Sequence, residues 1–260
     1  MEPKVTLVSS TEQPVRLMCW ARRVMHAPVP DYPTHGSHSP EIEWLGESYD
    51  DYFNSILLKD RMPTFLEYVQ VVFKLENVSR ALTHQLVRHR IGFSYSQQSL
   101  RCVDLPNFAN EQNYHNPYGE VNPEALDILD VAAFYHTKMT RIQEIYNKAL
   151  AEGVPTQDAR GLLPMNIGTT ITFSTNLRAL QGLINKRLCY KTQGEFNKVA
   201  QLMLAEVGKI DKRLLKFFGA PCEKSGKCMM EAENAQQLAE GKLTADQNTK
   251  MVCPKYKERH

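Results

Sequence analysis

Apolar residues recur with two different periods along this chain, and the change of period predicts the order of its helices and strands. Alternation at every second position predicts strands over residues 4–9, 65–75 and 166–173. Intervals of three and four predict helices over residues 11–25, 41–59, 77–90, 122–153, 156–163, 177–188 and 194–218. Helices interspersed with strands predict an α/β (α+β) fold, in which helices flank a central mixed or antiparallel sheet.

Capping residues and stop signals predict where the elements begin and end. Asn77 or Ser79 can cap the helix that ends near Arg90, and Asn122-Pro123 places a proline in the first turn of another helix. Gly219-Ala220-Pro221 ends the last long helix. We therefore expect one domain over residues 1–220 and a polar, cysteine-containing extension over residues 221–260.

The overall charge limits the kinds of partner. The chain has 260 residues, with 31 Lys and Arg against 29 Asp and Glu, so the formal net charge is only +2. A nearly neutral chain does not coat nucleic acid through counterion release. Its apolar runs are too short to cross a bilayer, and its first residues lack the apolar core of a secretory signal, so we expect a cytoplasmic protein that binds neither membranes nor nucleic acid.

Six cysteines are scattered along the chain without the density of a disulfide scaffold. A zinc site could be formed by Cys222, Cys228, Cys253 and His260. However, five residues separate the first two cysteines, whereas two to four are usual between zinc ligands. Free thiols and no metal are therefore expected.

The segment from Arg88 to Arg101 has the densest chemistry in the sequence. It contains three arginines, one histidine and three serines, but no acidic residue. Guanidinium groups and hydroxyls are donors suited to phosphate oxygens, so the segment predicts an anion site. The alternative is an exposed basic turn, and the absence of neutralising acids favours the anion site.

A second polar cluster lies far along the chain. Its members carry amide, guanidinium, ammonium or carboxylate groups and are Asn176, Arg178, Asn185, Lys186, Arg187, Lys191, Gln193 and Glu195. Amide and guanidinium donors suit the edge of a pyrimidine or a phosphate, and Arg160 can add to them. Taken singly, basic residues on helices are more often solvated surface charges.

These clusters together resemble the flavin-dependent thymidylate synthase family. Arg88-His89-Arg90, followed by Ser99 and Arg101, is similar to the family pattern of Arg-His-Arg, seven residues, Ser, one residue and Arg. Further blocks agree in order and spacing: 153–155, 159–160, 163–166, 176–180, 185–187, and residues 193 and 195. The resemblance covers roughly residues 4–218.

The resemblance implies an FAD-dependent methyltransferase that converts dUMP to dTMP, with methylenetetrahydrofolate and NADPH as co-substrates. It implies a homotetramer whose sites are shared between subunits. The implied dUMP residues are Gln85, Ser99, Arg101, Arg160 and Arg187, and Arg187 is also the implied catalytic residue, stabilising charge on the uracil. The implied FAD residues are Arg88, His89, Arg90, Thr64, Ser96, Gln97, Asn176, Arg178 and Lys191.

The sequence departs from the family pattern at a few positions. Eight residues instead of seven separate Arg90 from Ser99, and Met25, Met62 and Lys191 replace a usual Ser and two usual His. An alternative is therefore a divergent flavoenzyme on the same scaffold that modifies another pyrimidine nucleotide or transfers another one-carbon unit.

Two further alternatives come from other classes of protein. The first is a single-strand nucleic-acid module that uses Tyr95 for stacking, against which the near-neutral charge argues. The second is an enzyme with Cys102 or Cys189 as nucleophile, since both lie near arginines in the sequence. In the flavin-dependent family no cysteine attacks the pyrimidine.

Overall fold

The centre of the molecule is a four-stranded sheet. The computed structural model describes residues 1–26, 48–117, 128–241 and 253–258. The sheet contains β1 (Lys4–Ser10), β2 (Gln70–Ser79), β3 (Phe93–Gln97) and β4 (Gly168–Asn176), in the order β1-β2-β4-β3. All neighbouring strands are antiparallel. The expected sheet with helices is confirmed, and it is antiparallel.

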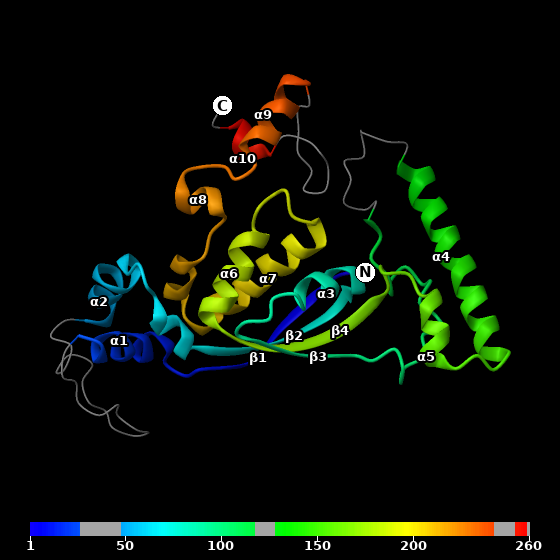
Figure 1. Ribbon diagram of the computed structural model, residues 1–260, viewed down its shortest axis with the longest axis horizontal. Helices are drawn as coiled ribbons and strands as arrows, with labels where there is room; N and C mark the ends of the chain where they lie inside the picture. The colour runs from blue at the N-terminus through cyan, green and yellow to red at the C-terminus, as the bar shows by residue number, and fades with distance from the viewer. Residues whose placement is uncertain (27–47, 118–127, 242–252, 259–260) are drawn as a thin grey trace.

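Helices lie in three groups, one over a face of this sheet and one beyond each of its ends (Figure 1). One group, on one face, contains α3 (Arg80–Leu86), α6 (Leu177–Arg187) and α7 (Gly194–Ile210). A second contains α1 (Pro14–Val24), α2 (Tyr49–Ser55) and the 3-10 helices Leu57–Lys59 and Thr64–Tyr68. A third contains α4 (Ile128–Ala151), α5 (Thr156–Ala159) and the 3-10 helix Arg160–Leu162.

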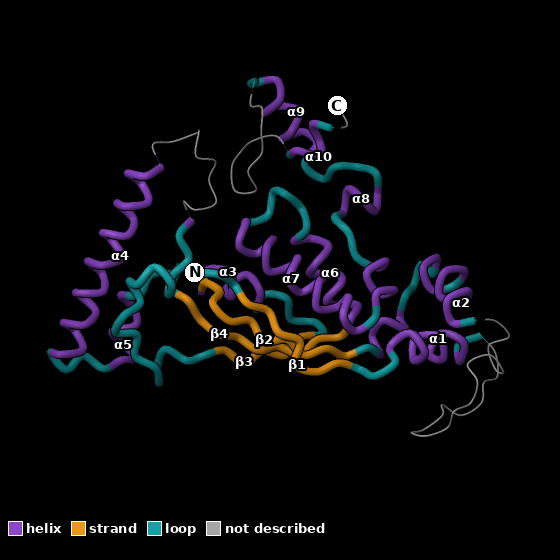
Figure 2. Tube along the Cα trace, turned by 180° about the vertical axis from the view of Figure 1, so that it is seen from behind, coloured by secondary structure: helices purple, strands orange, loops and turns teal. Residues whose placement is uncertain are grey.

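The end of the chain forms a separate layer above α6 and α7 (Figures 1 and 2). It contains three short helices, α8 (Pro221–Ser225), α9 (Glu231–Ala239) and α10 (Pro254–Lys257). The 3-10 helix Lys212–Phe217 connects α7 to this layer, and its Leu214 and Phe217 belong to the main core. Across the described residues, no helix is both long enough and apolar enough to cross a bilayer.

Alternation along the strands buries one face of the sheet. In β4, Ile171 and Phe173 are buried, whereas the residues between the buried positions are partly exposed. Phe173 lies opposite Phe73 of β2, with ring centroids 5.6 Å apart. Because a slip of one residue would expose these rings, the alternation fixes the register of the sheet.

The strand expected over residues 65–75 begins later than its pattern suggested. Phe65 and Leu66 are both buried, although they are adjacent, and they lie in a 3-10 helix that follows Pro63. Two successive buried side chains cannot point to one face of a strand, so β2 starts only at Gln70.

Two other boundaries also differ. The helix expected to end near Arg90 ends at Leu86, and the residues expected to form a loop after it include strand β3. The helix expected over residues 194–218 ends at Ile210, because Asp211 is extended and its side chain accepts from the Arg213 amide to start a 3-10 helix. Parts of two expected helices, residues 41–47 and 122–127, lie outside the described residues.

Candidate functional site

The turn between α3 and β3 carries the first basic cluster. Tyr95 Oη donates to the carbonyl oxygens of Leu86 and His89, at 2.9 and 2.7 Å, so a side chain of β3 fixes the backbone of the turn. Arg88 and Arg90 are exposed, whereas His89 is partly buried. The turn therefore presents two guanidinium groups to solvent around a fixed backbone.

Gly92 allows this turn to approach α6. Its φ is +76°, and a Cβ atom there would lie 2.8 Å from Ala179 Cβ and 3.0 Å from Asn176 Nδ2. A glycine accepts both the positive φ and the close contact. The Arg88–Arg90 turn and the start of α6, far apart in the sequence, are thus adjacent in the fold.

A chain of side-chain hydrogen bonds joins α3, α6 and α7. Arg187 Nη1 donates to Gln85 Oε1 at 3.1 Å, and Gln85 Nε2 donates to Gln193 Oε1 at 2.5 Å. Gln193 Nε2 donates to the buried Glu195 at 3.4 Å, and Glu195 also accepts from the amide and hydroxyl of Ser79 at 2.6 and 2.5 Å. The chain of bonds fixes Arg187 relative to Gln85, as expected if both serve one ligand.

Arg187 is partly buried without a carboxylate partner among the described residues. Its guanidinium lies over the Phe196 ring, 4.3 Å from the centroid, and its Nε atom is buried with no hydrogen-bond partner. Burial lowers the pKa of Arg187, but a guanidinium remains charged at neutral pH. An unneutralised cation with an unused donor is a site for an anion or a polarised carbonyl oxygen.

His89 lies in the electrostatic field of this arginine. Burial lowers the pKa of His89, and the charges of Arg187 and Lys186 lower it further. The imidazole is therefore neutral at neutral pH. The Arg88–Arg90 turn and the end of α6 thus form one electropositive region.

A second group of predicted residues lies where β3 leaves the sheet. Ser99 Oγ accepts from the Arg101 amide at 3.2 Å, and Arg101 Nη2 donates to Gln157 Oε1 of α5 at 3.3 Å. Arg160 follows α5 directly and, like Arg101, is exposed. These contacts bring Ser99 and Arg101 to the segment that carries Arg160.

Arg80 extends this second group, and the sequence analysis did not identify it. Its Nη2 donates to the Gln98 carbonyl oxygen at 2.6 Å, while its Nε is buried without a partner among the described residues. Burial lowers the pKa of Arg80, and the nearby charge of Arg160 lowers it further. Because the two guanidinium groups of Arg80 and Arg160 repel each other, an anion bound between them would be stabilised.

The remaining residues of β3 divide between its two faces. Gln97 Nε2 donates to Thr83 Oγ1 at 2.9 Å and lies 3.5 Å from Thr169 Oγ1, so its amide helps to hold α3 on the sheet. Ser96 is exposed on the opposite face. Of these two predicted FAD residues, only Ser96 presents its side chain to solvent.

Thr64, Asn176 and Arg178 surround the other end of the sheet. Arg178 Nη1 pairs with Glu67 Oε1 at 2.6 Å, and Thr64 Oγ1 lies 3.7 Å from Met25 Sδ. The side chain of Asn176 caps α6 by accepting from a backbone amide and also lies against Gly92. Asn176 therefore belongs with the Arg88–Arg90 turn, whereas Arg178 is neutralised in part by Glu67.

Lys191 is held by the C-terminal layer. Its Nζ donates to Gln237 Oε1 at 2.7 Å and to Glu233 Oε1 at 3.3 Å, both on α9. The described structure therefore directs the Lys191 ammonium toward α9.

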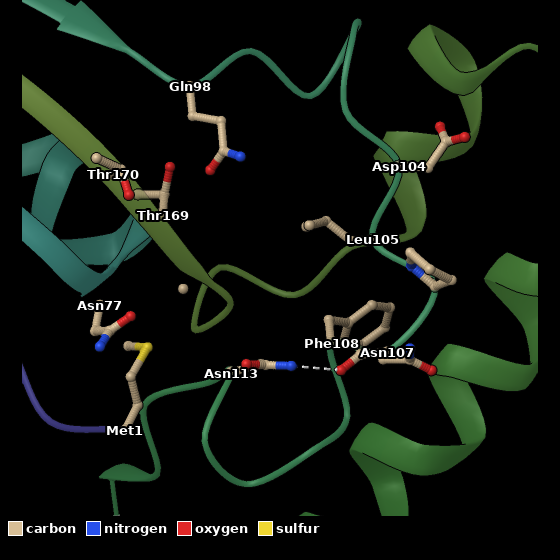
Figure 3. A pocket seen from close by; sticks show the side chains of 12 residues that line it. Met1, Asn77, Gln98, Asp104, Leu105, Asn107, Phe108, Asn113, Thr169 and Thr170 are labelled. Atoms are coloured by element: carbon tan, nitrogen blue, oxygen red, sulfur yellow. Dashed lines mark hydrogen bonds between the residues drawn. The ribbon is translucent and has the colours of Figure 1, made fainter.

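A pocket of about 250 Å³ lies beside the second group (Figure 3). Amides, hydroxyls and one carboxylate line it together with apolar side chains such as Leu105 and Phe108; the carboxylate is that of Asp104. Since its lining contains no Lys or Arg, this pocket does not suit a phosphate, and we do not assign it to the basic site.

The sequence did not identify further residues that hold Arg187 and Gln85 in place. The Phe196 ring lies under the Arg187 guanidinium, and Glu195 accepts from Gln193, which the sequence suggested only as a donor to a pyrimidine or a phosphate. A buried acid three residues before the exposed Lys198 in α7 gives no sequence signal of its contact with Ser79, because the two residues are 116 positions apart.

The antiparallel sheet and the two arginine-rich groups define an α/β protein that presents guanidinium donors to anions. The family model described as "Thymidylate synthase complementing protein" matches residues 6–211. The chain belongs to this family, which confirms the resemblance inferred from the separated motifs.

Relatives from archaea and bacteria agree with this match. The flavin-dependent thymidylate synthase of Pyrococcus abyssi is 31% identical over 238 residues, which cover 86% of this chain and 88% of the relative. The protein of that name from Clostridium tetani is 32% identical over 251 residues, covering 93% and 96%. That from Nitratidesulfovibrio vulgaris is 34% identical over 238 residues, covering 87% and 91%.

Proposed function

We propose that this protein is an FAD-dependent thymidylate synthase that converts dUMP to dTMP with methylenetetrahydrofolate and NADPH. The observation that carries the proposal is Arg187, a partly buried and unneutralised cation bonded to Gln85, in a chain whose relatives are named flavin-dependent thymidylate synthases. The methylene group bonds to C5 of uracil and becomes a methyl group. Because NADPH supplies the reducing equivalents, the folate leaves as tetrahydrofolate.

Two groups of residues hold dUMP in this proposal. Ser99, Arg101 and Arg160 bind the phosphate, since two exposed guanidinium groups and a hydroxyl lie around one segment. Gln85 and Arg187 bind the uracil, whose carbonyl oxygens accept from the Arg187 fork and the Gln85 amide. Gln85 must then release Gln193 or donate to the base through the second N–H of its Nε2.

Arg187 stabilises the charge that develops on the pyrimidine. Attack by C5 on the one-carbon unit requires electron density to move through the ring, and a fixed guanidinium stabilises the resulting negative charge on the carbonyl oxygens. Phe196 and Gln85 hold the guanidinium in place without neutralising it. The side chain is therefore prepared for that charge before the substrate arrives.

The Arg88–Arg90 turn fits the phosphates of FAD. Arg88 and Arg90 are exposed on a turn fixed by Tyr95, and among the described residues neither forms an ion pair. His89, Ser96 and Asn176 add donors beside them, and Thr64 and Arg178 lie at the neighbouring end of the sheet. The side chains of Gln97 and Lys191 are instead bonded to Thr83 and to α9. When bound, FAD carries the reducing equivalents and the one-carbon chemistry.

A homotetramer with shared sites completes the proposal. The two sets of proposed dUMP-binding residues lie in different parts of the fold (Figure 1). Those for the phosphate lie beside α5, and those for the uracil lie on α3 and α6. A neighbouring subunit that brings its own α5 region to this subunit's Arg187 would join them, and symmetry would repeat the arrangement.

The proposed function is tested by measuring flavin absorbance and dTMP formation on the same protein. We expect the purified full-length protein to show the visible absorption of oxidised flavin and to form dTMP only when dUMP, methylenetetrahydrofolate and NADPH are all present. Mixtures that lack one substrate are the controls. A protein that binds no flavin after reconstitution would refute the proposal.

A second candidate function rests on two methionines. Met25 and Met62 are 57% and 69% exposed and both contact Thr64, where the family usually places Ser and His. A site altered there could accept a different pyrimidine nucleotide. Mass analysis of products from dUMP and dCMP in parallel reactions separates the two functions, and product from dCMP alone would favour the second.

A further inference from the structure

Four of the six cysteines, from four separate segments, line one cavity. Cys189 follows α6, Cys222 lies in α8, Cys228 follows α8, and Cys253 precedes α10. The cavity has a volume of about 280 Å³. The three C-terminal cysteines also line an adjacent space of about 50 Å³. The chain therefore brings four thiols together between the α6–α7 connection and the C-terminal layer.

Two of these sulfur atoms accept hydrogen bonds from backbone amides two residues further on. Cys228 Sγ accepts from the Met230 amide at 3.4 Å, and Cys189 Sγ accepts from the Lys191 amide. The fully buried Asn234 donates to Cys228 Sγ at 3.4 Å and accepts from the Cys253 amide at 3.0 Å. Donors aimed at sulfur stabilise a thiolate, the form that binds metals.

When no cation is bound, its surroundings favour the thiol form of Cys189. Burial raises the pKa of Cys189; the Lys191 amide opposes that effect, and the proximity of Cys253, Cys222 and Cys228 raises the pKa further. A divalent cation reverses this balance, because it displaces the protons and neutralises neighbouring thiolates.

The C-terminal layer has little core of its own. Among its described residues, the buried apolar cluster contains only Cys253 and Tyr256, with Tyr190 and Cys228 packed against them. Helices as short as α8 and α10, of 5 and 4 residues, are not stable alone. Small folded units of this kind usually depend on a metal or a covalent link.

We propose that Cys189, Cys222, Cys228 and Cys253 bind a zinc ion and so fix the C-terminal layer to the α6–α7 connection. Four thiolates are a preferred ligand set for tetrahedral zinc. Cys189, which lies outside the extension, takes the place that the sequence comparison gave to His260 as fourth ligand.

Zinc binding requires the side chains to close on the ion. Among the described residues, no three His, Cys, Asp or Glu side chains are already placed as ligands of one metal ion. The cysteines must therefore change χ1 rotamer from their positions around the cavity. The inference does not depend on the proposed enzymatic function, since metal content and turnover are measured separately.

The first experiment measures metal in the full-length protein, purified under reducing conditions without chelator. We expect about one zinc per chain. Cobalt substituted under anaerobic conditions should give intense d–d bands at wavelengths longer than those of oxidised flavin, as tetrahedral thiolate sites do. Neither measurement depends on a variant that has to fold.

Variants then locate the site. Cys228→Ser should lose most of the metal, whereas Cys102→Ser, which changes an exposed cysteine away from the cavity, should retain it. A reduced protein that takes up no zinc or cobalt would overturn the proposal. Equal metal loss in both variants would also overturn it, as would an intact mass showing these cysteines paired as disulfides.

Discussion

At the scale of single residues, the fold holds the Arg187 guanidinium partly buried and without a neutralising carboxylate among the described residues. Burying a cation is costly unless it is paired, yet among the described residues Arg187 has a carbonyl oxygen of Gln85 and the face of Phe196 in place of a carboxylate. The missing neutralisation raises the affinity of this position for a ligand with negative charge.

The first prediction concerns Arg187→Ala. Turnover should fall by about 100-fold or more, because one charge-stabilising donor is lost, while flavin content changes little. Steady-state kinetics and flavin absorbance measure the two effects. Arg141→Ala, which removes an exposed arginine paired with Glu144 on α4, is the matched control. Equal loss of flavin and turnover would show that the role is misassigned.

The second prediction concerns His89 and pH. Its folded pKa lies below the usual 6.5, so the unfolded state binds the proton more readily. The contribution of neutral His89 to stability is present above about pH 6.5 and is lost as pH falls below that value.

Urea unfolding of ligand-free protein between about pH 8 and about pH 5 measures this effect. The wild type should lose more free energy of unfolding across the range than His89→Gln, whose side chain does not titrate. Parallel pH profiles for the two proteins would contradict the prediction.

At the scale of elements, the sequence predicted what depends on periodicity and missed what depends on distant contacts. Helix α6 follows its apolar spacing closely. Strand β3 was missed although Phe93, Tyr95 and Gln97 alternate with serines, because the basic residues before it favoured a loop interpretation. Only pairing with β4 shows that the alternation is real.

In the candidate site too, local motifs were predicted from the sequence and contacts between distant segments were not. The motifs singled out Gln85, Arg101 and Arg187 as polar residues suited to anions, and the fold bonds Gln85 to Arg187 and Arg101 to α5. They could not indicate that α9 holds Lys191, since Glu233 and Gln237 lie over 40 positions away. Whether the predicted residues bind their ligands stays a prediction.

The third prediction compares two glycines. Gly92→Ala should destabilise the protein by about 1–3 kcal/mol, because φ is positive and the new methyl group meets Ala179. Flavin affinity should fall with it, since the Arg88–Arg90 turn must move. Gly182→Ala, in α6 with open space around its Cβ position, should instead stabilise by about 0.5–1 kcal/mol. Chemical denaturation measures both, and equal signs would contradict the argument.

The fourth prediction concerns Glu195, which joins α7 to α3. Glu195→Gln should cost about 2 kcal/mol of stability, because a buried acceptor of donors from Ser79 and Gln193 is replaced in part by another donor. Glu206→Gln, on the same helix and paired with Lys209, is the control and should cost under about 1 kcal/mol. If both variants unfold at the same denaturant concentration, the bonds of Glu195 between α7 and α3 do not add to stability as argued.

At the scale of the whole molecule, the predicted residues occupy separate parts of one chain. Arg101 and Arg160 lie by α5 beyond one end of the sheet, while Arg187 lies on its helical face (Figure 1). A ligand as small as a nucleotide needs both groups within one cavity, so assembly of several copies is the simplest way to complete the site.

The fifth prediction tests that assembly by complementation. Arg101→Ala and Arg187→Ala should each be inactive, but equal amounts mixed and allowed to exchange subunits should recover roughly a quarter of wild-type activity. The reason is that a shared site takes Arg101 from one subunit and Arg187 from another, and one random pairing in four contains both. Mixing each variant with itself is the control. If the mixture stays inactive although mass spectrometry detects mixed oligomers, both arginines must act within a single chain.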